Sequence, residues 1–155
     1  MRSSAILMTG LMVFATAVAD ADEAMETRSP VRIDAEKLAG HGLEGYEPFP
    51  DEIVLAGESK HSYFTSFTGK ELVVEVYQAA PAKLRIDDPW PYDEFILLLS
   101  GRLVLTDAEG TVTEYETGES LVVPKGFRGT WEMQGDFREL VVIETEAYMS
   151  SEEGE

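Results

Sequence analysis

The chain has 155 residues, 30 of them acidic and 12 basic, which gives a formal net charge of -18, and it contains no cysteine. This length suits one domain with terminal extensions. The charge argues against nucleic acid as a partner, and the lack of cysteine excludes disulfides, thiolate catalysis, zinc–thiolate sites and a lipid-modified cysteine.

The chain begins with a pattern typical of a secretory signal peptide. An apolar run from Ala5 to Ala19 follows one basic residue, Arg2, and ends in small residues that suit cleavage within residues 19–22. The run is shorter than the ~20 residues that span a membrane. We expect residues 1–21 to be removed and the protein to be exported, to the periplasm or the extracellular space, without membrane contact after cleavage. A retained membrane anchor is the alternative.

Residues 22–58 are expected to form a partly flexible N-terminal extension. It starts with a polar, acidic stretch up to Pro30 and continues into residues 31–38, which suit either one helical turn or a short strand. Glycines and prolines then break regular structure. The extension is also a candidate for adding a strand to the sheet of a second copy of the chain.

Short β-rich runs alternate with turn signals in residues 59–147. The runs cover residues 61–67, 71–78, 83–86, 94–99, 102–106, 111–115, 120–123, 127–133 and 139–145. Strands this short and evenly spaced are typical of an all-β sandwich or barrel. Alternation places Glu94, Ile96 and Leu98 on one face, and Trp131 and Met133 on an interior face. The acidic residues that follow predict a frayed, disordered tail at 148–155.

Glycines mark the predicted corners between these runs. Ser100 and Gly101 are expected to join two strands in a tight hairpin where the backbone needs a positive φ. Gly118 and Gly126 are expected to turn corners in the same way, and Pro124 ends a strand without needing a ladder donor.

Two ordered segments carry a resemblance to a known family. The first is Glu94–Gly101, preceded by Tyr92 and Asp93, and the second runs from Gly118 to Glu132 through the sequence PKGFRGTW. Together they resemble the cupin superfamily, in particular the small single-domain branch similar to the cupin modules of (S)-ureidoglycine aminohydrolase and of ethanolamine-utilisation proteins. The resemblance covers roughly residues 72–143. It implies an all-β, cupin-type β-barrel (double-stranded β-helix, or jelly roll) and a homodimer; an unrelated β-sandwich is the alternative.

The resemblance also implies where metal ligands would lie. Cupins that bind metal have two histidines just ahead of the glutamate, and these positions hold Asp88 and Trp90 here, or Asp87 and Pro89 if the spacing is one residue longer. The third histidine position holds Gly129.

Only Glu94 matches the ligand pattern of the family. A divalent metal needs at least three convergent donors, so no cofactor is expected. The weak alternative is a divalent metal held by Glu94, Asp88 and His61.

Aromatic residues occur near the same predicted barrel mouth. Gly129 is expected to leave open the space of a ligand imidazole, while two indoles and two phenols surround it. The predicted ligand-binding residues are Tyr77, Trp90, Tyr92, Glu94, Gly129 and Trp131. The alternative is that the indoles fill the barrel and complete its core.

Glu94 is the one candidate catalytic residue, because a carboxylate on an interior face must be paired, hydrogen-bonded or neutralised. It suits a general acid or base, an anchor for a cationic ligand, or a structural partner of Lys125, Arg128 or Arg138. The sequence thus favours an exported cupin-like protein that binds an unknown small organic molecule. The alternatives are a metal-dependent hydrolase or isomerase of the ureidoglycine aminohydrolase type and a non-catalytic interaction module with a plugged barrel.

Overall fold

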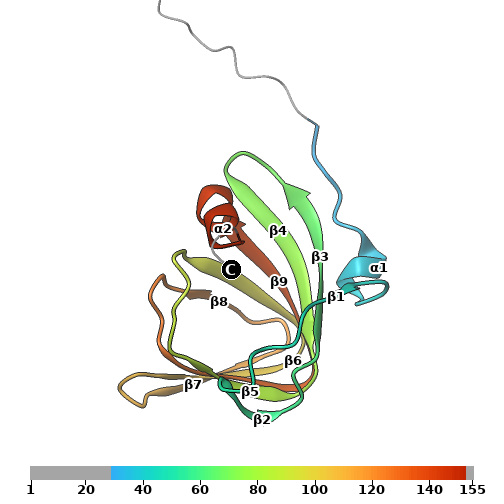
Figure 1. Ribbon diagram of the computed structural model, residues 1–155. Coiled ribbons are helices and arrows are strands. Elements are labelled where there is room, and N and C mark those ends of the chain that lie inside the picture. Colours follow the sequence, from blue (N-terminus) through green and yellow to red (C-terminus); the bar gives the residue numbers. More distant parts are fainter. Residues whose placement is uncertain (1–28, 153–155) are drawn as a thin grey trace, which may run out of the picture. The chain divides into compact units, whose positions relative to one another are not determined.

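The structure, a computed structural model, describes residues 29–152 (Figure 1). The predicted signal peptide, residues 1–21, and its cleavage position lie outside the described residues. Within residues 29–152, no helix is both long enough and apolar enough to cross a membrane.

Strands dominate the part of the chain that starts at Val31, as the sequence pattern predicts. The helices are α1 (Ala35–Leu38) and α2 (Thr145–Glu152). The strands are β1 (Glu44–Gly45), β2 (Val54–Gly57), β3 (His61–Thr68), β4 (Leu72–Ala79), β5 (Ala82–Ile86), β6 (Glu94–Asp107), β7 (Val112–Glu116), β8 (Ser120–Val123) and β9 (Gly129–Glu144).

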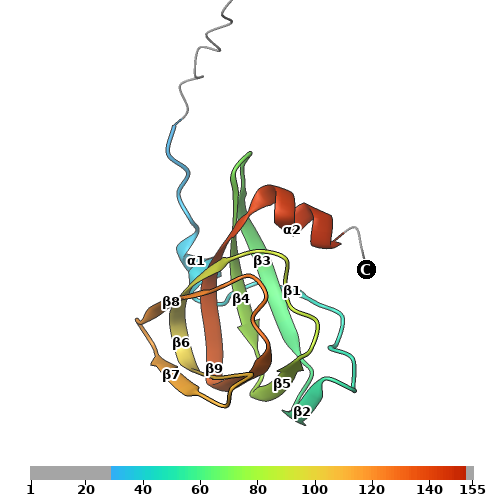
Figure 2. The same cartoon turned by 90° about the vertical axis from the view of Figure 1, so that its left-hand side faces the viewer.

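The two longest strands, β6 and β9, hold the sheet together. They pair antiparallel along their whole length, from Glu94 opposite Ile143 to Asp107 opposite Gly129. The second half of β9 also pairs with β4 and its first half with β5, while β6 pairs with β7 and β8. The sheet therefore curls on itself, with β7 and β8 on one side and β3 and β4 on the other (Figures 1 and 2). This is the all-β, cupin-type jelly roll that the sequence predicts.

The predicted hairpin at Ser100 and Gly101 is wrong. Residues 94–107 form one strand whose register shifts on either side of Ser100, and residues 129–144 likewise form one strand instead of two. Gly101 does have a positive φ of 77°, and a Cβ there would lie 2.6 Å from the carbonyl oxygen of Gln134. Gly135, with φ 70°, lies beside it. Positive φ at two facing glycines bends the paired strands together, so the chain continues across the bend.

The N-terminal extension is more regular than expected. Its residues 44–45 pair with β3 and its residues 54–57 pair with β5, so both strands join the sheet of their own chain. Helix α1 has Asp34 as its N-cap, whose Oδ1 accepts a hydrogen bond from the Glu36 amide at 2.8 Å. The ordered domain therefore begins well before the predicted boundary at residue 59.

The predicted disordered tail, 148–155, is instead helical up to residue 152. Two hydrogen bonds hold helix α2 against the sheet: Thr145 Oγ1 donates to the Gly69 carbonyl at 2.9 Å, and the Tyr148 hydroxyl donates to Glu75 Oε1 at 2.9 Å. These tertiary contacts offset the weak helix tendency of an acidic tail. Residues 153–155 lie outside the described range.

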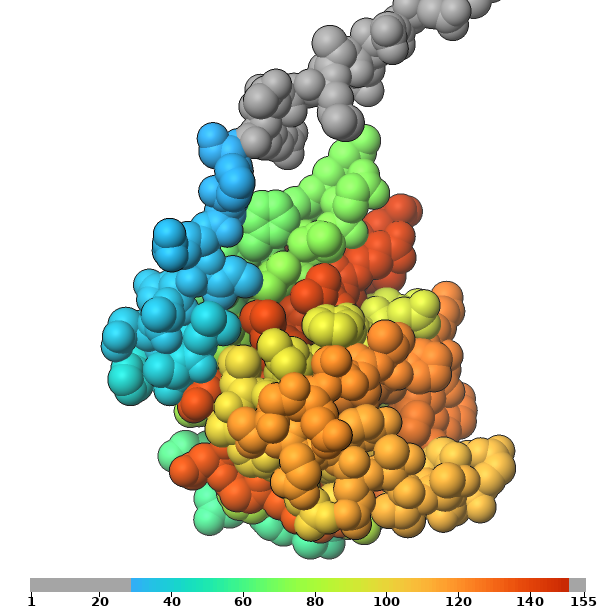
Figure 3. Space-filling model, turned by 180° about the vertical axis from the view of Figure 1, so that it is seen from behind, coloured from blue at the N-terminus to red at the C-terminus, as the bar shows by residue number. Residues whose placement is uncertain are grey.

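Alternation along β6 and β9 positions the core as the sequence predicts. Ile96, Leu98 and Met133 are fully buried, and Trp131 is 5% exposed. The opposite face of β6 is partly open: Phe95 is exposed and pairs with the exposed Val122 of β8. Figure 3 shows the segment from β6 to β8, in yellow and orange, covering much of the surface on that side. The apolar core thus faces the inside of the curled sheet.

Candidate functional site

The curled sheet encloses a cavity of about 460 Å³. Its lining comes from strands β3, β4, β5, β6 and β9, from helix α2, from the loop residues 46–50 and from Trp90 and Tyr92. Five of the six predicted ligand-binding residues line it: Tyr77, Trp90, Tyr92, Glu94 and Trp131. Sequence reasoning therefore predicted part of the lining of this cavity, although it missed several polar groups, and ligand binding by these residues stays a prediction.

The sixth predicted residue, Gly129, does not line the cavity. Its φ is 143°, and a Cβ at this position would overlap the carbonyl oxygen of Thr106 on the paired strand β6. The missing side chain therefore allows two backbones to approach closely, and it leaves no space for a ligand. The prediction of a vacated ligand position at Gly129 is wrong.

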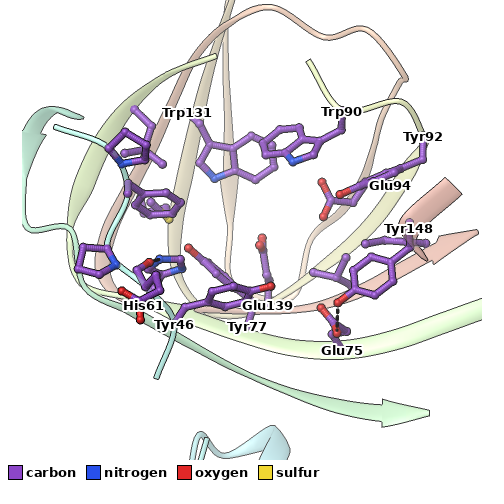
Figure 4. A pocket seen from close by; sticks show the side chains of 18 residues that line it. Tyr46, His61, Glu75, Tyr77, Trp90, Tyr92, Glu94, Trp131, Glu139 and Tyr148 are labelled. Atoms are coloured by element: carbon purple, nitrogen blue, oxygen red, sulfur yellow. Dashed lines mark hydrogen bonds between the residues drawn. The ribbon is translucent and has the colours of Figure 1, made fainter. Parts of the chain in front are cut away.

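Two indoles form one wall of the cavity. Trp131 lies on β9 opposite Leu84 of β5, and Trp90 lies on the loop between β5 and β6, where its carbonyl accepts a hydrogen bond from the Gly126 amide at 3.3 Å. The two rings meet edge to face, with centroids 5.7 Å apart and an interplanar angle of 73°. Both rings also pack in the core, yet the space beside them stays open (Figure 4). The indoles therefore line the barrel without plugging it.

Three carboxyl groups reach the cavity from neighbouring strands. On β9, Val141 is opposite Glu75 of β4, and Ile143 is opposite Glu94 of β6. Glu139 lies two residues before Val141 on β9 and has the same inward orientation. The register thus places the three glutamates around the inward-facing side of Val141.

Sequence reasoning missed Glu75 and Glu139. Each lies in a predicted strand and interrupts an apolar run, and Glu75 shares the face of Tyr77 by alternation. A charged residue at an inward position of a predicted strand was therefore the available signal.

The environments of these carboxyl groups differ. Glu75 Oε1 accepts hydrogen bonds from Thr65 Oγ1 at 2.7 Å and from the Tyr148 hydroxyl at 2.9 Å, so Glu75 ties helix α2 to the sheet. Glu139 is 3% exposed, and its Oε2 has no hydrogen-bond partner among the described residues. Glu94 is partly buried.

Burial changes the acidity of the inner groups. It raises the pKa of Glu94 from 4.5 to about 7, with a further contribution from the negative charge of Glu75. It raises the pKa of Glu139 well above its ordinary value, helped by the charge of Glu94. Burial, followed by the charges of Glu139 and Glu94 and a contribution from Tyr46, also raises the pKa of Tyr77. The cavity therefore favours protonated carboxyl groups near neutral pH.

None of the basic residues proposed as partners of Glu94 lines the cavity. Arg128 donates instead to the carbonyl of Asp87, and the Lys125 amide donates to Asp93 Oδ1 at 2.8 Å. Among the described residues that line the cavity there is no lysine or arginine. Glu94 is therefore not neutralised there by a basic side chain.

His61 lines the opposite part of the cavity from the indoles (Figure 4). Its ring stacks between Tyr46, at 5.2 Å and 2°, and Phe49, at 4.0 Å and 12°. Nε2 lies 2.7 Å from the Glu47 carbonyl, which can only accept, so Nε2 carries the proton. Burial lowers the pKa of His61, against the opposing effect of this hydrogen bond. Its Nδ1 is buried and has no partner among the described residues.

Comparison with known proteins agrees with this geometry. Residues 70–139 match the family of EutQ-like cupin domains. The chain contains a cupin domain. No curated protein matches it.

Solved structures with a similar fold come from several bacteria. A protein of unknown function from Pseudomonas syringae is 23% identical with a TM-score of 0.58, over 65% of this chain and 43% of its own. The polyketide cyclase RemF from Streptomyces resistomycificus is 16% identical with a TM-score of 0.50, over 77% of this chain and 80% of its own. A putative ethanolamine utilization protein Q from Salmonella typhimurium is 21% identical with a TM-score of 0.49, over 56% of this chain and 70% of its own.

The likenesses to the Pseudomonas and Streptomyces structures support the fold of the cupin domain and no more, because both lie below 25% identity. The chain spans less than half the length of the Pseudomonas protein. The finer resemblance to ureidoglycine aminohydrolase stays a prediction.

The side chains of this cupin domain do not fit a divalent metal ion. Of the alternative ligand set, Glu94 and His61 line the cavity, but Asp88 is exposed and lies outside it. Within the described part of the chain, no group of three or more histidine, aspartate or glutamate side chains is arranged to hold a metal.

Proposed function

We propose that this cupin domain binds a small organic molecule in the cavity of its barrel. The observation that carries the proposal is the open space of about 460 Å³ beside Trp90 and Trp131. Small-molecule sites have volumes of roughly 300–1,000 Å³ and combine apolar walls with a few polar groups. An interaction module with a plugged barrel has no use for such a space.

Glu94 is the group best suited to proton transfer if the bound molecule is also turned over. A general acid or base works best when its pKa lies near the working pH, and burial raises the pKa of Glu94 to about 7. Glu94 lines the cavity beside Tyr92 and so lies within reach of a bound molecule (Figure 4). Glu94 therefore supports weak acid–base turnover of the bound molecule in addition to its binding.

Tryptophan fluorescence provides a direct test, because Trp90 and Trp131 are the only tryptophans in the chain. Titration with a library of small metabolites is expected to shift or quench their emission for at least one compound. The variants Trp90→Phe and Trp131→Phe then identify the responding indole. If no compound changes the emission of protein that circular dichroism shows to be folded, the proposal fails.

Metal analysis separates this proposal from a metal-dependent hydrolase or isomerase. Protein purified without chelators is expected to hold far less than one manganese, iron or zinc ion per chain. A near-stoichiometric metal that is lost in Glu94→Gln would overturn the preference for metal-free binding.

Export is the second part of the proposal and rests on the sequence of residues 1–22 alone. Expression of the full chain in a bacterial host, followed by fractionation and N-terminal sequencing, tests it. The mature protein is expected outside the cytoplasm with a new N-terminus within residues 20–22. A cytoplasmic protein that keeps Met1 would contradict export.

A further inference from the structure

We propose that the ligand of this cavity is a small organic amine in its protonated form, with its ammonium group bound by Glu139 and Glu94. The inference rests on the proposed function, because it names the chemical class of the molecule that occupies the same cavity. Three independent features of the cavity support it: its charged residues, its unpaired acceptors and its aromatic walls.

The charged residues of the cavity are of one sign. Its described lining includes Glu47, Glu75, Glu94 and Glu139 and no lysine or arginine. The whole chain carries a net charge of -18, so its field also concentrates cations near the opening. An anionic ligand would find no lysine or arginine among the described lining residues, and its charge would oppose ionisation of the glutamates.

Two residues that line the cavity carry a polar atom without a hydrogen-bond partner among the described residues. Glu139 Oε2 is buried and lacks a hydrogen-bond partner among the described residues, and so does His61 Nδ1. Because Nε2 of His61 carries the proton, Nδ1 offers a lone pair. A buried acceptor without a partner destabilises the protein, because it has lost its hydrogen bonds to water. An ammonium group can donate to His61 Nδ1 and to an ionised Glu139, whereas a carbonyl or carboxylate ligand has no donor for His61 Nδ1.

The aromatic walls suit both halves of such a molecule. Figure 4 shows Trp90 and Trp131 on one side of the cavity, Tyr77 and Glu139 on the other, and Glu94 at its edge. A hydrocarbon group packs against the indoles, while their faces also attract a cation that lies within about 6 Å of the ring centre. The carboxyl groups across the cavity then receive the ammonium group.

Proton release is expected to accompany binding. The empty cavity favours protonated Glu94 and Glu139, since burial raises the pKa of both groups. A bound ammonium group stabilises their ionised forms, so amine affinity is expected to rise as the pH increases through about 7. The other titratable groups that line the same space are Tyr46, Glu47, His61, Glu75, Tyr77, Tyr92 and Tyr148.

Matched probes test the charge requirement. Phenethylamine, 2-phenylethanol and 3-phenylpropionate have similar size and differ in charge. Binding is measured by tryptophan emission at about pH 8. The amine is still protonated at this pH, because its pKa is near that of lysine, about 10. The amine is expected to bind at least tenfold more tightly than the alcohol. The propionate is expected to bind weakest.

Variants then identify the carboxyl groups. Glu139→Gln and Glu94→Gln are each expected to weaken amine binding at least tenfold and to leave alcohol binding within about twofold, because only the charge is removed. Glu109→Gln removes the same charge at an exposed turn outside the cavity and is expected to change neither affinity. If Glu139→Gln does not fold, Glu94→Gln and calorimetric measurement of proton release by the wild-type protein in two buffers provide the test.

The outcomes separate the inference from the proposed function. Equal or tighter binding of the alcohol or the propionate, or a library ligand that is neutral or anionic, would overturn the amine assignment while small-molecule binding stands. Amine binding without proton release and without loss in either glutamate variant would also overturn it. If neither the probes nor any library compound changes the emission of the folded protein, both proposals fail.

Discussion

Replacement of Glu94 by glutamine is expected to change how the stability of the domain depends on pH. Burial raises the pKa of Glu94 from 4.5 to about 7, so the folded state holds this proton more tightly than the unfolded state does. A raised carboxyl pKa makes the free energy of unfolding fall as the pH rises from the unfolded value through the folded value. Glutamine cannot titrate, and it therefore removes this loss.

The size of the effect follows from the two pKa values. At about 1.4 kcal/mol for each pH unit, a rise from 4.5 to about 7 corresponds to roughly 3–4 kcal/mol, most of which is lost between about pH 5 and about pH 8. The charge of Glu94 also raises the pKa of Glu139, so Glu94→Gln lowers the pKa of Glu139 and thereby changes the stability in the same direction. Domains of this size have roughly 5–15 kcal/mol of stability, so the difference is large enough to measure.

Denaturation by urea, followed by far-ultraviolet circular dichroism across this pH range, measures the effect. Relative to the wild type, the free energy of unfolding of Glu94→Gln is expected to rise by roughly 2–3 kcal/mol between about pH 5 and about pH 8. The exposed variant Glu109→Gln controls for the change in net charge and is expected to follow the wild type. A stability difference that stays constant with pH, or that grows toward acid, would refute the raised pKa of Glu94.

Two further variants test the fold around the site. Gly129→Ala is expected to destabilise the domain by more than about 3 kcal/mol, because its Cβ would overlap the Thr106 carbonyl and its φ is 143°. Thermal unfolding measures the loss. Gly110→Ala is the control with the milder expected effect, since Gly110 has a φ of 86° and open space around it. Equal effects of the two glycine variants would contradict the close backbone approach. Tyr148→Phe is expected to lower the free energy of unfolding by about 1 kcal/mol, because the hydrogen bond to Glu75 is lost. Amide hydrogen exchange in α2 is expected to become faster. Unchanged exchange would show that this bond does not hold the helix.

The sequence predicts the fold and much of the cavity lining because both depend on local patterns. Alternation with a period of two puts Glu94, Ile96 and Leu98 on one face before any strand pairing is known. In the structure Glu94 lines the cavity, and Ile96 and Leu98 are buried. The spaced glycines and the PKGFRGTW segment resemble a cupin, and the fold agrees. The same local logic brings Tyr77 and Trp131 to the cavity.

The corrected predictions concern what the glycines do. Gly101 has the positive φ that the sequence predicts, but the same φ serves a hairpin or a bend within a strand. The pairing of β6 with β9 on both sides of Gly101 shows that this positive φ forms a bend within the strand. Gly129 likewise is required by the nearness of Thr106, a residue 23 positions earlier in the chain that no local pattern connects to it.

The sequence by itself thus determined which residues alternate inward along each strand, and the tertiary structure decided which of them meet. Glu75, Glu94 and Glu139 share one cavity only because the register of β4 and β6 against β9 places them around Val141. Helix α2 likewise depends on the hydrogen bond between Tyr148 and Glu75, two residues that lie 73 positions apart in the chain. Side-chain alternation follows from the geometry of one extended chain, whereas register depends on pairing between distant segments and on the total burial that the closed sheet achieves.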